Sequence, residues 1–506
     1  MLKPLKPYSV LNSEAIITLS CFVTVTVGIN TITYGCAIGF PAILLPQLKS
    51  PNSELEVTKK SESWIAAILA LSLLAGNFVS PFIMVRLGRK IAHFTVSVIF
   101  LCGWYITLLA SNVEVLIIGR IFLGIAGGIL STLRSILVGE YTSPRNRGAF
   151  LSTLSLTQAF GIMLVHLIGS LFSWQKTALM CVFFPFISLI MIVYTPESPS
   201  WLIAKGRYNE SRQVFRWLRG NDEDNELESM ILARMAFEQA KIKEYKDGNC
   251  FRRWFQTIKK KEFYKPILIL IHSNTILHFS GGTTIASYST VILGHLMGPK
   301  ANVHFWMVFL DVQRVISNSI FVYIINRTKR RIMIFSTGAL SLVSHVAIAI
   351  FIYLKTSGWN YDSIWLPALL INIQFFAVAV GTVPLPQVIG GEVLPLEYRS
   401  IGGTISLATG GSIMFLVLKT FPELIDNCGL HGTYVVYTMV IFVNLLLIGV
   451  FLPETKGKTL QQIEDEFRGR PLRLEEIEAR QSLQSNPVEN YKRKMSESNT
   501  IIETYN

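Results

Sequence analysis

The stretch "MVRLGRKIAHF", residues 84–94, interrupts an apolar sequence with a short basic turn, and "IINRTKRRIMIF", residues 324–335, does the same again. Three cations of the first turn match three cations of the second at a constant offset of 241 residues. They are Arg86, Arg89 and Lys90, which correspond to Arg327, Arg330 and Arg331. The apolar blocks beside each turn predict pairs of membrane helices that are joined too tightly to move independently.

The composition places most of the chain in a membrane. Of the 506 residues, 51% are hydrophobic and 16% are charged, whereas soluble proteins carry roughly 25% charged residues. A helix needs about 20 mostly apolar residues to cross a bilayer. The twelve predicted spans are 16–38, 63–85, 91–110, 115–138, 149–171, 177–195, 267–290, 302–325, 331–354, 364–390, 400–421 and 432–452. Gly124 and Gly128 are four residues apart in the fourth span, which predicts close helix packing.

Positive charge in the short loops predicts the orientation, because loops rich in Lys and Arg stay in the cytoplasm. The turns after spans 2, 4, 8 and 10 are basic, and those on the other side carry acids or isolated lysines. We therefore expect a multi-pass protein of the plasma membrane with both termini in the cytoplasm. The expected parts are an N-terminal segment 1–15, a six-helix half 16–195, a linker 196–265 with short amphipathic helices, a second half 266–453 and a partly disordered tail 454–506.

Two further charged motifs recur in the same order. "GEYTSPRNRG" (139–148) and "GEVLPLEYRS" (391–400) share Gly-Glu followed by an Arg, at an offset of 252 residues. "TPESPSWL" (195–202) and "LPETKGKTL" (452–460) share Pro-Glu, at an offset of 257 residues. The repeats predict an all-α membrane protein with twelve transmembrane helices in two pseudo-symmetric six-helix halves. A solute site near the bilayer midplane, where the halves meet, is typical of that architecture.

The basic turns also suggest a mechanical role. Their cations are expected to pair with carboxylates at the ends of neighbouring helices and to complement the negative C-terminal ends of helices. The candidate carboxylates are Glu140, Glu197, Glu392 and Glu454. Such a network would stabilise one access state and break in the other. The alternative, which is compatible with the first, is that the charges only set the topology.

Six segments together resemble the sugar porters of the major facilitator superfamily, in particular the branch of insect facilitated trehalose transporters. They are WIAAILALSLLAGNFVSPFIMVRLGRK (64–90), GRIFLGIAGG (119–128), GEYTSPRNRGAF (139–150), PESPSWLIAKGR (196–207), GTVPLPQVIGGEVLP (381–395) and PETKGKTLQQIEDEF (453–467). The likeness extends over roughly residues 15–470. It implies the major facilitator fold and transport of a sugar.

The resemblance also implies roles for individual residues. The family's cytoplasmic gating network corresponds here to Arg86, Arg89, Lys90, Glu140, Arg147, Glu197, Arg327, Arg330, Arg331, Glu392, Arg399 and Glu454. Pro384 and Pro386 match the prolines of the family's broken tenth helix. A break is expected there, because proline removes a backbone donor and kinks a helix. Where the family has Asp in its two basic turns, this chain has Val85 and Asn326, and Lys329 replaces a Gly. We therefore expect an altered salt-bridge gate.

The expected sugar site departs from the family pattern as well. Sugars are held by amides, which both donate and accept, and by aromatic faces. In helix 7, "LHFSGGT" (277–283) stands where the family often has amides, Gln387 replaces a Trp, and Gly410-Gly411 replaces an Asn-Trp pair. The candidate substrate-binding residues are His278, Ser280, Thr283, Thr284, Tyr288, Gln387, Gln158, Pro384 and Pro386.

Ionisable residues inside the predicted spans are costly and suggest function. Asp311 and Arg314 lie three residues apart and share a helix face. They are interpreted as a neutralised structural pair, a proton or cation coupling site, or a substrate contact. Arg134 is expected to pair with Asp311 or to extend towards the cytoplasmic end of its helix. His166 is expected to be an interior histidine with satisfied hydrogen bonds.

Three functions remain open. The chain lacks a Gly-x-x-x-x-Gly-Lys-Ser/Thr nucleotide motif, so energy must come from a solute or ion gradient. The first hypothesis is a facilitated carrier for a sugar or a related neutral polyol, such as trehalose or a hexose-like solute. The second is a proton-coupled symporter that titrates at Asp311 or His278. The third is a transport-poor nutrient sensor on the same fold.

The expected partners are a small-molecule sugar or polyol and the lipid bilayer. We attribute the net charge of +13 to loops beside an anionic inner leaflet and not to nucleic acid, since no basic patch with interleaved aromatics stands out. The sequence shows neither a metal-ligand constellation nor a nucleophile–base pair. We therefore expect no enzyme activity, no cofactor and no metal, and we expect a monomer.

Overall fold

The computed structural model describes residues 13–51, 53, 55–142, 144–219, 227–228, 230–231, 258–325, 327–359, 361, 363–395, 398–458 and 460–470. Much of the predicted linker 196–265 lies outside the described residues, as do the first residues of the chain and most of the C-terminal tail. Within the described ranges the regular secondary structure is helical, as the apolar blocks predict.

The N-terminal half contains six long helices, and two short helices follow it. Their bounds are α1 Ser13–Leu48, α2 Lys59–Leu87, α3 Arg89–Leu108, α4 Val113–Tyr141, α5 Pro144–Leu171, α6 Trp174–Tyr194, α7 Pro199–Ala204 and α8 Tyr208–Arg219. Helices α2 and α3 meet at Gly88, whose φ of 100° gives the tight corner between them. Arg89 and Lys90 are therefore the first residues of α3.

The C-terminal half repeats the series with two breaks. Its helices are α11 Lys261–Phe279, α12 Gly282–Met297, α13 Val303–Ile325, α14 Arg330–Thr356, α15 Trp365–Ala377, the π-helix η1 Val378–Thr382, α16 Leu385–Val393 and α17 Arg399–Phe451, followed by α18 Leu460–Arg468. Helix α17 bends at Gly429 and so covers the last two predicted spans. The tenth predicted span is interrupted at η1, next to Pro384 and Pro386.

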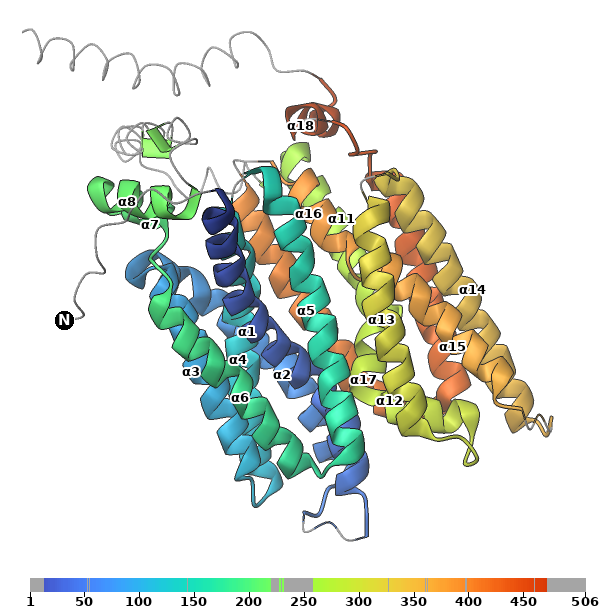
Figure 1. The fold of residues 1–506 in the computed structure, drawn as a ribbon. Helices are drawn as coiled ribbons and strands as arrows, with labels where there is room; N and C mark the ends of the chain where they lie inside the picture. The colour runs from blue at the N-terminus through green and yellow to red at the C-terminus, as the bar shows by residue number, and fades with distance from the viewer. Residues whose placement is uncertain are drawn as a thin grey trace, which may run out of the picture.

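The long helices run side by side across the molecule (Figure 1). Within the described residues, ten helical segments are long and apolar enough to cross a membrane. That set counts α17 once and omits α11 and α12, which together fill the seventh predicted span. The predicted all-helical membrane fold is confirmed.

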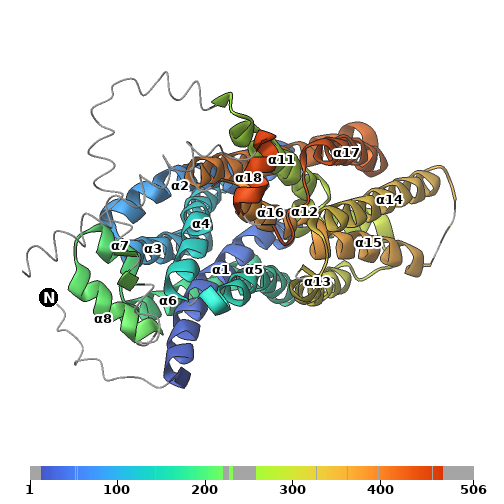
Figure 2. The same ribbon diagram turned by 90° about the horizontal axis from the view of Figure 1, so that it is seen from above.

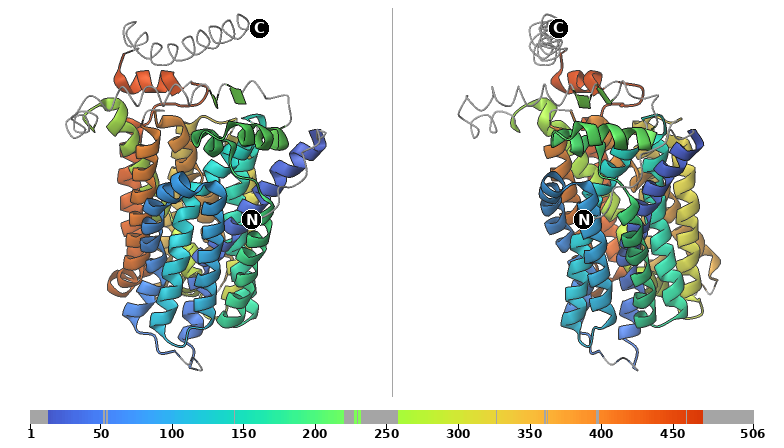
Figure 3. Two further views of the ribbon diagram at one scale, coloured as in Figure 1. Left: turned by 90° about the vertical axis from the view of Figure 1, so that its left-hand side faces the viewer. Right: turned by 60° about the vertical axis from the view of Figure 1, so that its left-hand side comes forward.

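The two ends of the bundle differ. The basic end carries the α2–α3 and α13–α14 turns, and the distal end lies opposite it (Figure 1). Helices α7 and α8 lie across the basic end of the N-terminal half, and α18 lies over the second half beside α11 and α16 (Figures 2 and 3).

The halves meet through three helix pairs, which are α1 with α12, α2 with α17, and α5 with α13. Helix α4 packs mainly on α1, α2, α3 and α5, all from its own half. Helix α16 packs mainly on α11, α14, η1 and α18. Neither α4 nor α16 is a main partner in the contacts that join the halves.

Helix α4 approaches α2 closely through the two predicted glycines. A Cβ added at Gly124 would lie 2.4 Å from the Leu69 carbonyl oxygen, and one at Gly128 would lie 2.2 Å from the Leu73 carbonyl oxygen. The predicted close packing is confirmed. Small residues permit it because no apolar solvent effect drives helices together inside lipid, so backbone contact must supply the attraction.

This packing predicts opposite effects for two alanine substitutions in one helix. Gly128→Ala should push α4 away from α2 and destabilise the protein by about 1–3 kcal/mol. Gly139→Ala is the matched control, because no heavy atom lies within 4 Å of its added Cβ. It should be neutral or stabilising, since alanine favours helix over glycine. Thermal unfolding of the purified variants in detergent measures both, and equal midpoints would contradict the packing argument.

Candidate functional site: two basic clusters and a distal lock

The first basic cluster joins three elements of the N-terminal half. The Arg89 guanidinium donates to both carboxylate oxygens of Glu140 at the end of α4, at 3.1 and 3.0 Å. The amides of Arg89 and Lys90 donate to Glu197 at 2.8 and 3.1 Å. The Ser198 hydroxyl donates to Glu140. One carboxylate thus binds the guanidinium, and the other caps the start of α3, where the helix dipole favours negative charge.

The second cluster repeats this arrangement in the C-terminal half. The Arg330 guanidinium donates to Glu392 at 2.9 Å. The amides of Arg330 and Arg331 donate to Glu454 at 3.0 and 3.2 Å. The Thr455 hydroxyl donates to Glu392, as Ser198 does to Glu140. The sequence repeat therefore extends to individual hydrogen bonds.

The remaining cations of the turns repeat in the same way. The Lys90 ammonium donates to the Val193 carbonyl at 2.8 Å, and Arg331 donates to the Leu452 carbonyl at 3.0 Å. Each of these cations therefore binds the C-terminal end of the last helix of its own half. Two arginines instead stack on aromatic rings one turn earlier, each 4.3 Å from the ring centroid; the pairs are Arg86 on Phe82 and Arg327 on Tyr323.

Each basic cluster stays within one half of the protein. The contacts described above join α2, α3, α4 and α6 in one half, and α13, α14, α16 and α17 in the other. The side chains of Arg147 and Arg399, two further gating candidates, lie outside the described residues. In this state the described part of the network braces each half and does not connect the two.

The two capping carboxylates have opposite acid–base behaviour. Burial raises the pKa of Glu197 above its ordinary value of 4.5, although three backbone amides donate to it. Glu454 is less buried. Burial would raise its pKa too, but the amides of Lys456, Arg330 and Arg331 and the charge of Arg330 together hold the pKa below 4.5.

These shifts predict that acid strengthens one cluster and weakens the other. A raised pKa means that the closed cluster binds its proton more tightly than the opened one. The Glu197 cluster should therefore gain stability as the pH falls from neutral through the raised pKa towards 4.5. The Glu454 cluster should lose stability as the pH falls below 4.5 through its lowered pKa. Hydrogen exchange at the amides of Arg89 and Arg330, corrected for the intrinsic rate, should change in opposite directions, and a common direction would contradict the assignment.

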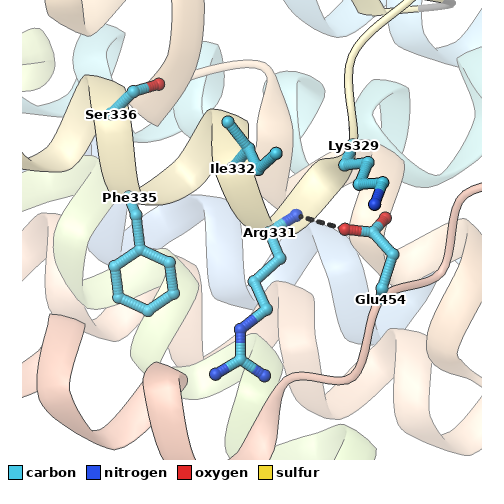
Figure 4. A pocket seen from close by; sticks show the side chains of 6 residues that line it. All are labelled: Lys329, Arg331, Ile332, Phe335, Ser336 and Glu454. Atoms are coloured by element: carbon cyan, nitrogen blue, oxygen red, sulfur yellow. Dashed lines mark hydrogen bonds between the residues drawn. The ribbon is translucent and has the colours of Figure 1, made fainter.

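A surface groove of about 630 Å³ lies beside the second cluster (Figure 4). Its lining is Lys329, Arg331, Ile332, Phe335, Ser336 and Glu454. The groove is formed by the start of α14 and the segment after α17, both from the C-terminal half. Because it lies away from the contacts between the halves, it does not belong to the solute route considered below.

At the distal end, one imidazole joins both halves. His166 on α5 lies 2.5 Å from the Asp311 carboxylate on α13, measured from Nδ1. Its Nε2 faces the carbonyl oxygens of Gly39 on α1 at 3.1 Å and Ala286 on α12 at 3.2 Å. The side chains of His166 and Asp311 are 1% and 4% exposed.

The contacts of His166 fix where its protons are. Nε2 faces only carbonyl acceptors, so it carries a proton and donates. A second proton must then lie between Nδ1 and the Asp311 oxygen, whichever atom holds it. The pair is neutral overall in either arrangement, which removes most of the cost of burying a charge in a membrane. Separating α5 from α13 requires breaking this contact.

Prolines supply further acceptors near the distal end. Proline has no N–H, so the carbonyl four residues earlier in the helix loses its partner. Three such carbonyls each receive a side-chain donor. The sets of proline, carbonyl and donor are Pro41 with Ala37 and Arg120, Pro46 with Ala42 and Thr290, and Pro422 with Leu418 and Tyr288. The second set joins α1 to α12, and therefore one half to the other.

Other cross-half contacts lie in the same region. The Ser287 hydroxyl donates to the Ile38 carbonyl at 3.3 Å. Lys59, at the start of α2, forms a 3.0 Å ion pair with Asp426. Together with the His166–Asp311 pair and the Thr290 contact, these define what we call the distal lock.

Most of the predicted substrate residues are buried in this state. The buried members are His278, Ser280, Thr283, Thr284, Tyr288, Pro384 and Pro386. The chain breaks between α11 and α12 at Gly281, whose φ is 100°. His278 Nδ1 lies 2.8 Å from the Thr283 hydroxyl across that break. His278 and Thr283 therefore satisfy each other in this state.

Accessible polar groups instead lie on α4, α5, α11 and α16. Gln387 is exposed, and Gln158, Arg134 and Asn274 are half-buried. The Arg134 guanidinium donates to the Gln158 side-chain oxygen at 2.9 Å. Asn274 donates to Ser406 on α17 at 3.2 Å. Of the predicted substrate residues, Gln158 and Gln387 thus remain open to a solute.

The structure gives two charged residues other direct partners than the sequence suggested. Asp311 bonds His166 directly. Arg314, which still interacts with the charge of Asp311, donates to the Gly282 carbonyl at 3.3 Å and stacks on Phe375. Arg134 neither pairs with Asp311 nor extends to the helix end. Asp311 lies near the distal end, whereas Arg134 lies in the basic half of α4 and bonds Gln158 on the adjacent helix.

A polar cluster inside the C-terminal half was not predicted. Gln374 donates to the Ser280 carbonyl at 3.2 Å, lies 3.3 Å from His345, and accepts from the Tyr434 hydroxyl at 3.3 Å. A cavity of about 10 Å³ beside it has room for about one water. Polar residues spaced along apolar helices were the only sequence signal, and they do not reveal which helices meet.

Comparison with known proteins gives a consistent result. The family model described as "Sugar (and other) transporter" matches residues 20–467. The chain is 27% identical to the facilitated trehalose transporter Tret1 of Bombyx mori over 461 residues, which cover 90% of this chain and 88% of that protein. It is 26% identical to Tret1 of Aedes aegypti, covering 89% of this chain and 55% of that protein.

Solved structures share the fold. The major facilitator superfamily proton:xylose symporter XylE, solved with 6-bromo-6-deoxy-D-glucose, superposes with a TM-score of 0.70 at 17% identity. That match covers 90% of this chain and 100% of that chain. The inward-open conformation of XylE from E. coli gives 0.69 at 17% identity, covering 89% and 99%.

Proposed function

Since the chain belongs to the sugar (and other) transporter family, we propose that it carries a sugar-like solute, of the trehalose or hexose kind, across the plasma membrane by facilitated, alternating-access transport. In this proposal the basic end faces the cytoplasm, in keeping with the positive charge of its loops. The chain acts as a monomer, because one copy supplies both halves and the interface between them.

The distribution of contacts between the halves carries this proposal. At the distal end, the His166–Asp311 pair and the Thr290 and Ser287 hydroxyls connect the halves. At the basic end, the Arg89 and Arg330 clusters each close within one half. This asymmetry is expected of a carrier that is closed to the outside and ready to open, or already open, to the cytoplasm.

Alternating access then follows from rigid halves that rock about the interface. The basic clusters keep each half intact, because an Arg–carboxylate pair with several donors holds three helix ends together. Opening the distal end breaks the lock, and contacts elsewhere must replace it. In this proposal the solute route runs between α4 and α16, neither of which is a main partner in the contacts that join the halves.

The second candidate, a proton-coupled symporter, is favoured by one observation. The proton shared by His166 and Asp311 sits in the contact that must break when the distal end opens. Buried Arg120 offers no comparable site, because it donates to the carbonyls of Ala37 and Ile65 and not to a carboxylate. Proton coupling therefore depends on Asp311.

Uptake of radiolabelled trehalose and glucose into proteoliposomes tests both candidates. A facilitator should equilibrate the sugar, show countertransport, and be unaffected when the proton gradient is dissipated. Uptake that depends on the gradient and is lost in Asp311→Asn would favour the symporter. Sugar binding without uptake under any gradient would contradict transport and favour a nutrient sensor.

A further inference from the structure

Resting on the proposed function, we propose that the hexose-like solute is a sugar acid with one carboxylate, and that Arg134 and Gln158 bind this carboxylate. The inference begins with a cation inside the bundle that the fold does not neutralise. Arg134 stands seven residues before the end of α4, which places it about 10 Å inside the bundle at 1.5 Å per residue.

Contacts in the N-terminal half hold Arg134 in place. Its guanidinium donates to Gln158 on α5 at 2.9 Å. Tyr34 on α1 bonds the Ser131 side chain and lies close to Arg134. The Tyr34 ring is held against α4, because a Cβ at Gly127 would lie 2.5 Å from it. Three helices of one half therefore form the surroundings of this guanidinium.

The charge of Arg134 has no acidic partner among the described residues. Within the twelve predicted spans the one carboxylate is Asp311, and His166 binds it. Arg134 carries five N–H donors, and its described hydrogen bond is the one to Gln158. An uncompensated cation in a membrane protein interior is costly unless a ligand neutralises it.

Arg134 shares one face of α4 with an exposed serine. Ser131, Arg134 and Ser135 share that face by their spacing. Ser135 matches Gln387 at the 252-residue offset of the repeat, and both are exposed. Two residues at equivalent positions of α4 and α16, one from each half, are thus accessible at the same depth.

The C-terminal half offers groups suited to hydroxyls. Gln387 provides both donors and an acceptor. Asn274 uses its amide nitrogen to bind Ser406, which leaves its side-chain oxygen as an acceptor. A polyhydroxylated solute can therefore place its hydroxyls against α11 and α16 and its anionic end against α4 and α5.

The count of charges selects a monoanion. A neutral sugar leaves Arg134 uncompensated, and a phosphate dianion leaves one negative charge buried without a partner. One carboxylate makes a neutral pair with the guanidinium, and it fits that planar group through two parallel hydrogen bonds. Uronates and aldonates combine such a carboxylate with the hydroxyls of a sugar.

Binding of three matched ligands to the purified full-length chain at pH 7 tests the inference. They are glucuronate, its amide glucuronamide, and glucose, which share a ring and differ at one carbon. Glucuronate should bind at least about 10-fold more tightly than the other two, as expected for hydrogen bonds to a charged group. Arg134→Gln should abolish this preference, and Arg134→Lys should retain part of it.

Arg212→Gln, at an exposed linker arginine that pairs with Glu228, is the matched control and should bind like the wild type. Equal or tighter binding of glucose and glucuronamide by the wild-type chain would overturn the sugar-acid assignment while leaving sugar transport intact. Absence of binding and uptake for all three ligands and for trehalose would overturn both proposals. The comparison within the wild-type chain stands even if a variant fails to fold.

Discussion

Replacing Asp311 by Ala is expected to open the distal end far more often than in the wild type. The substitution leaves the Nδ1 atom of a fully buried His166 without its 2.5 Å partner. Loss of a hydrogen bond to a charged or proton-sharing group costs roughly 2–3 kcal/mol. That contact exists only when α5 and α13 are together. Losing the hydrogen bond therefore destabilises the state that is closed at the distal end. The population of the open state should rise about 30- to 150-fold.

Labelling of Ser287→Cys measures this shift. Ser287 is 1% exposed and contacts Ile38 of the other half, so a thiol there reacts with a membrane-impermeant reagent only when the distal end opens. Val312→Ala is the matched control, since Val312 is the next residue of the same helix after Asp311 but is 42% exposed. An unchanged labelling rate in Asp311→Ala would show that the pair is not a lock.

Replacing Arg330 by Ala is expected to destabilise the C-terminal half. The Arg330 side chain is 11% exposed, and that of its partner Glu392 is 26% exposed. The guanidinium also donates to the carbonyls of Ile325 and Thr328. Breaking one side of a fully buried ion pair costs about 3–5 kcal/mol, and partial exposure reduces this. We expect a loss of roughly 2–3 kcal/mol in unfolding free energy.

Thermal or denaturant unfolding in detergent measures this loss against Arg327→Ala. Arg327 lies in the same turn but stacks on Tyr323 at the surface, so its substitution should cost about 1 kcal/mol or less. Equal stability of the two variants would contradict the bracing role of the Arg330 cluster. Because the cluster stays within one half, Arg330→Ala should not change labelling of Ser287→Cys at the distal end.

The basic clusters could be predicted in detail, because their charged residues recur in both halves of the sequence. Cations and carboxylates that recur at fixed offsets must occupy equivalent positions in both halves. Glu140 and Glu392 therefore bind matching arginines, and Glu197 and Glu454 cap matching helices. That these contacts act as a gate between access states remains a prediction.

The distal lock could not be predicted in this way. The spacing of Asp311 and Arg314 shows that they share a helix face, but not which helix of the other half lies against that face. His166 is 145 residues away from Asp311 and has no equivalent partner in the repeat. Prolines at positions 41, 46 and 422 reveal that carbonyls are freed, but their donors come from helices far away in the sequence.

The shape of helix 7 was not predicted, for a local reason. The seventh span was predicted as one continuous helix, 267–290. The Gly281-Gly282 pair breaks it, because a φ of 100° at Gly281 suits glycine alone. The break brings His278 Nδ1 to 2.8 Å from the Thr283 hydroxyl. Two adjacent glycines within an apolar span were the signal for this bend.

Paired distance measurements at both ends of the bundle test the central claim, that the two halves rock about their interface. Spin labels at Gly139→Cys and Gly391→Cys occupy equivalent positions with no heavy atom within 4 Å, and labels at Lys59→Cys and Asp426→Cys report on the distal end. As bound sugar solute shifts the access state, one distance should lengthen while the other shortens. Two distances that stay constant, or that change in the same direction, would contradict alternating access.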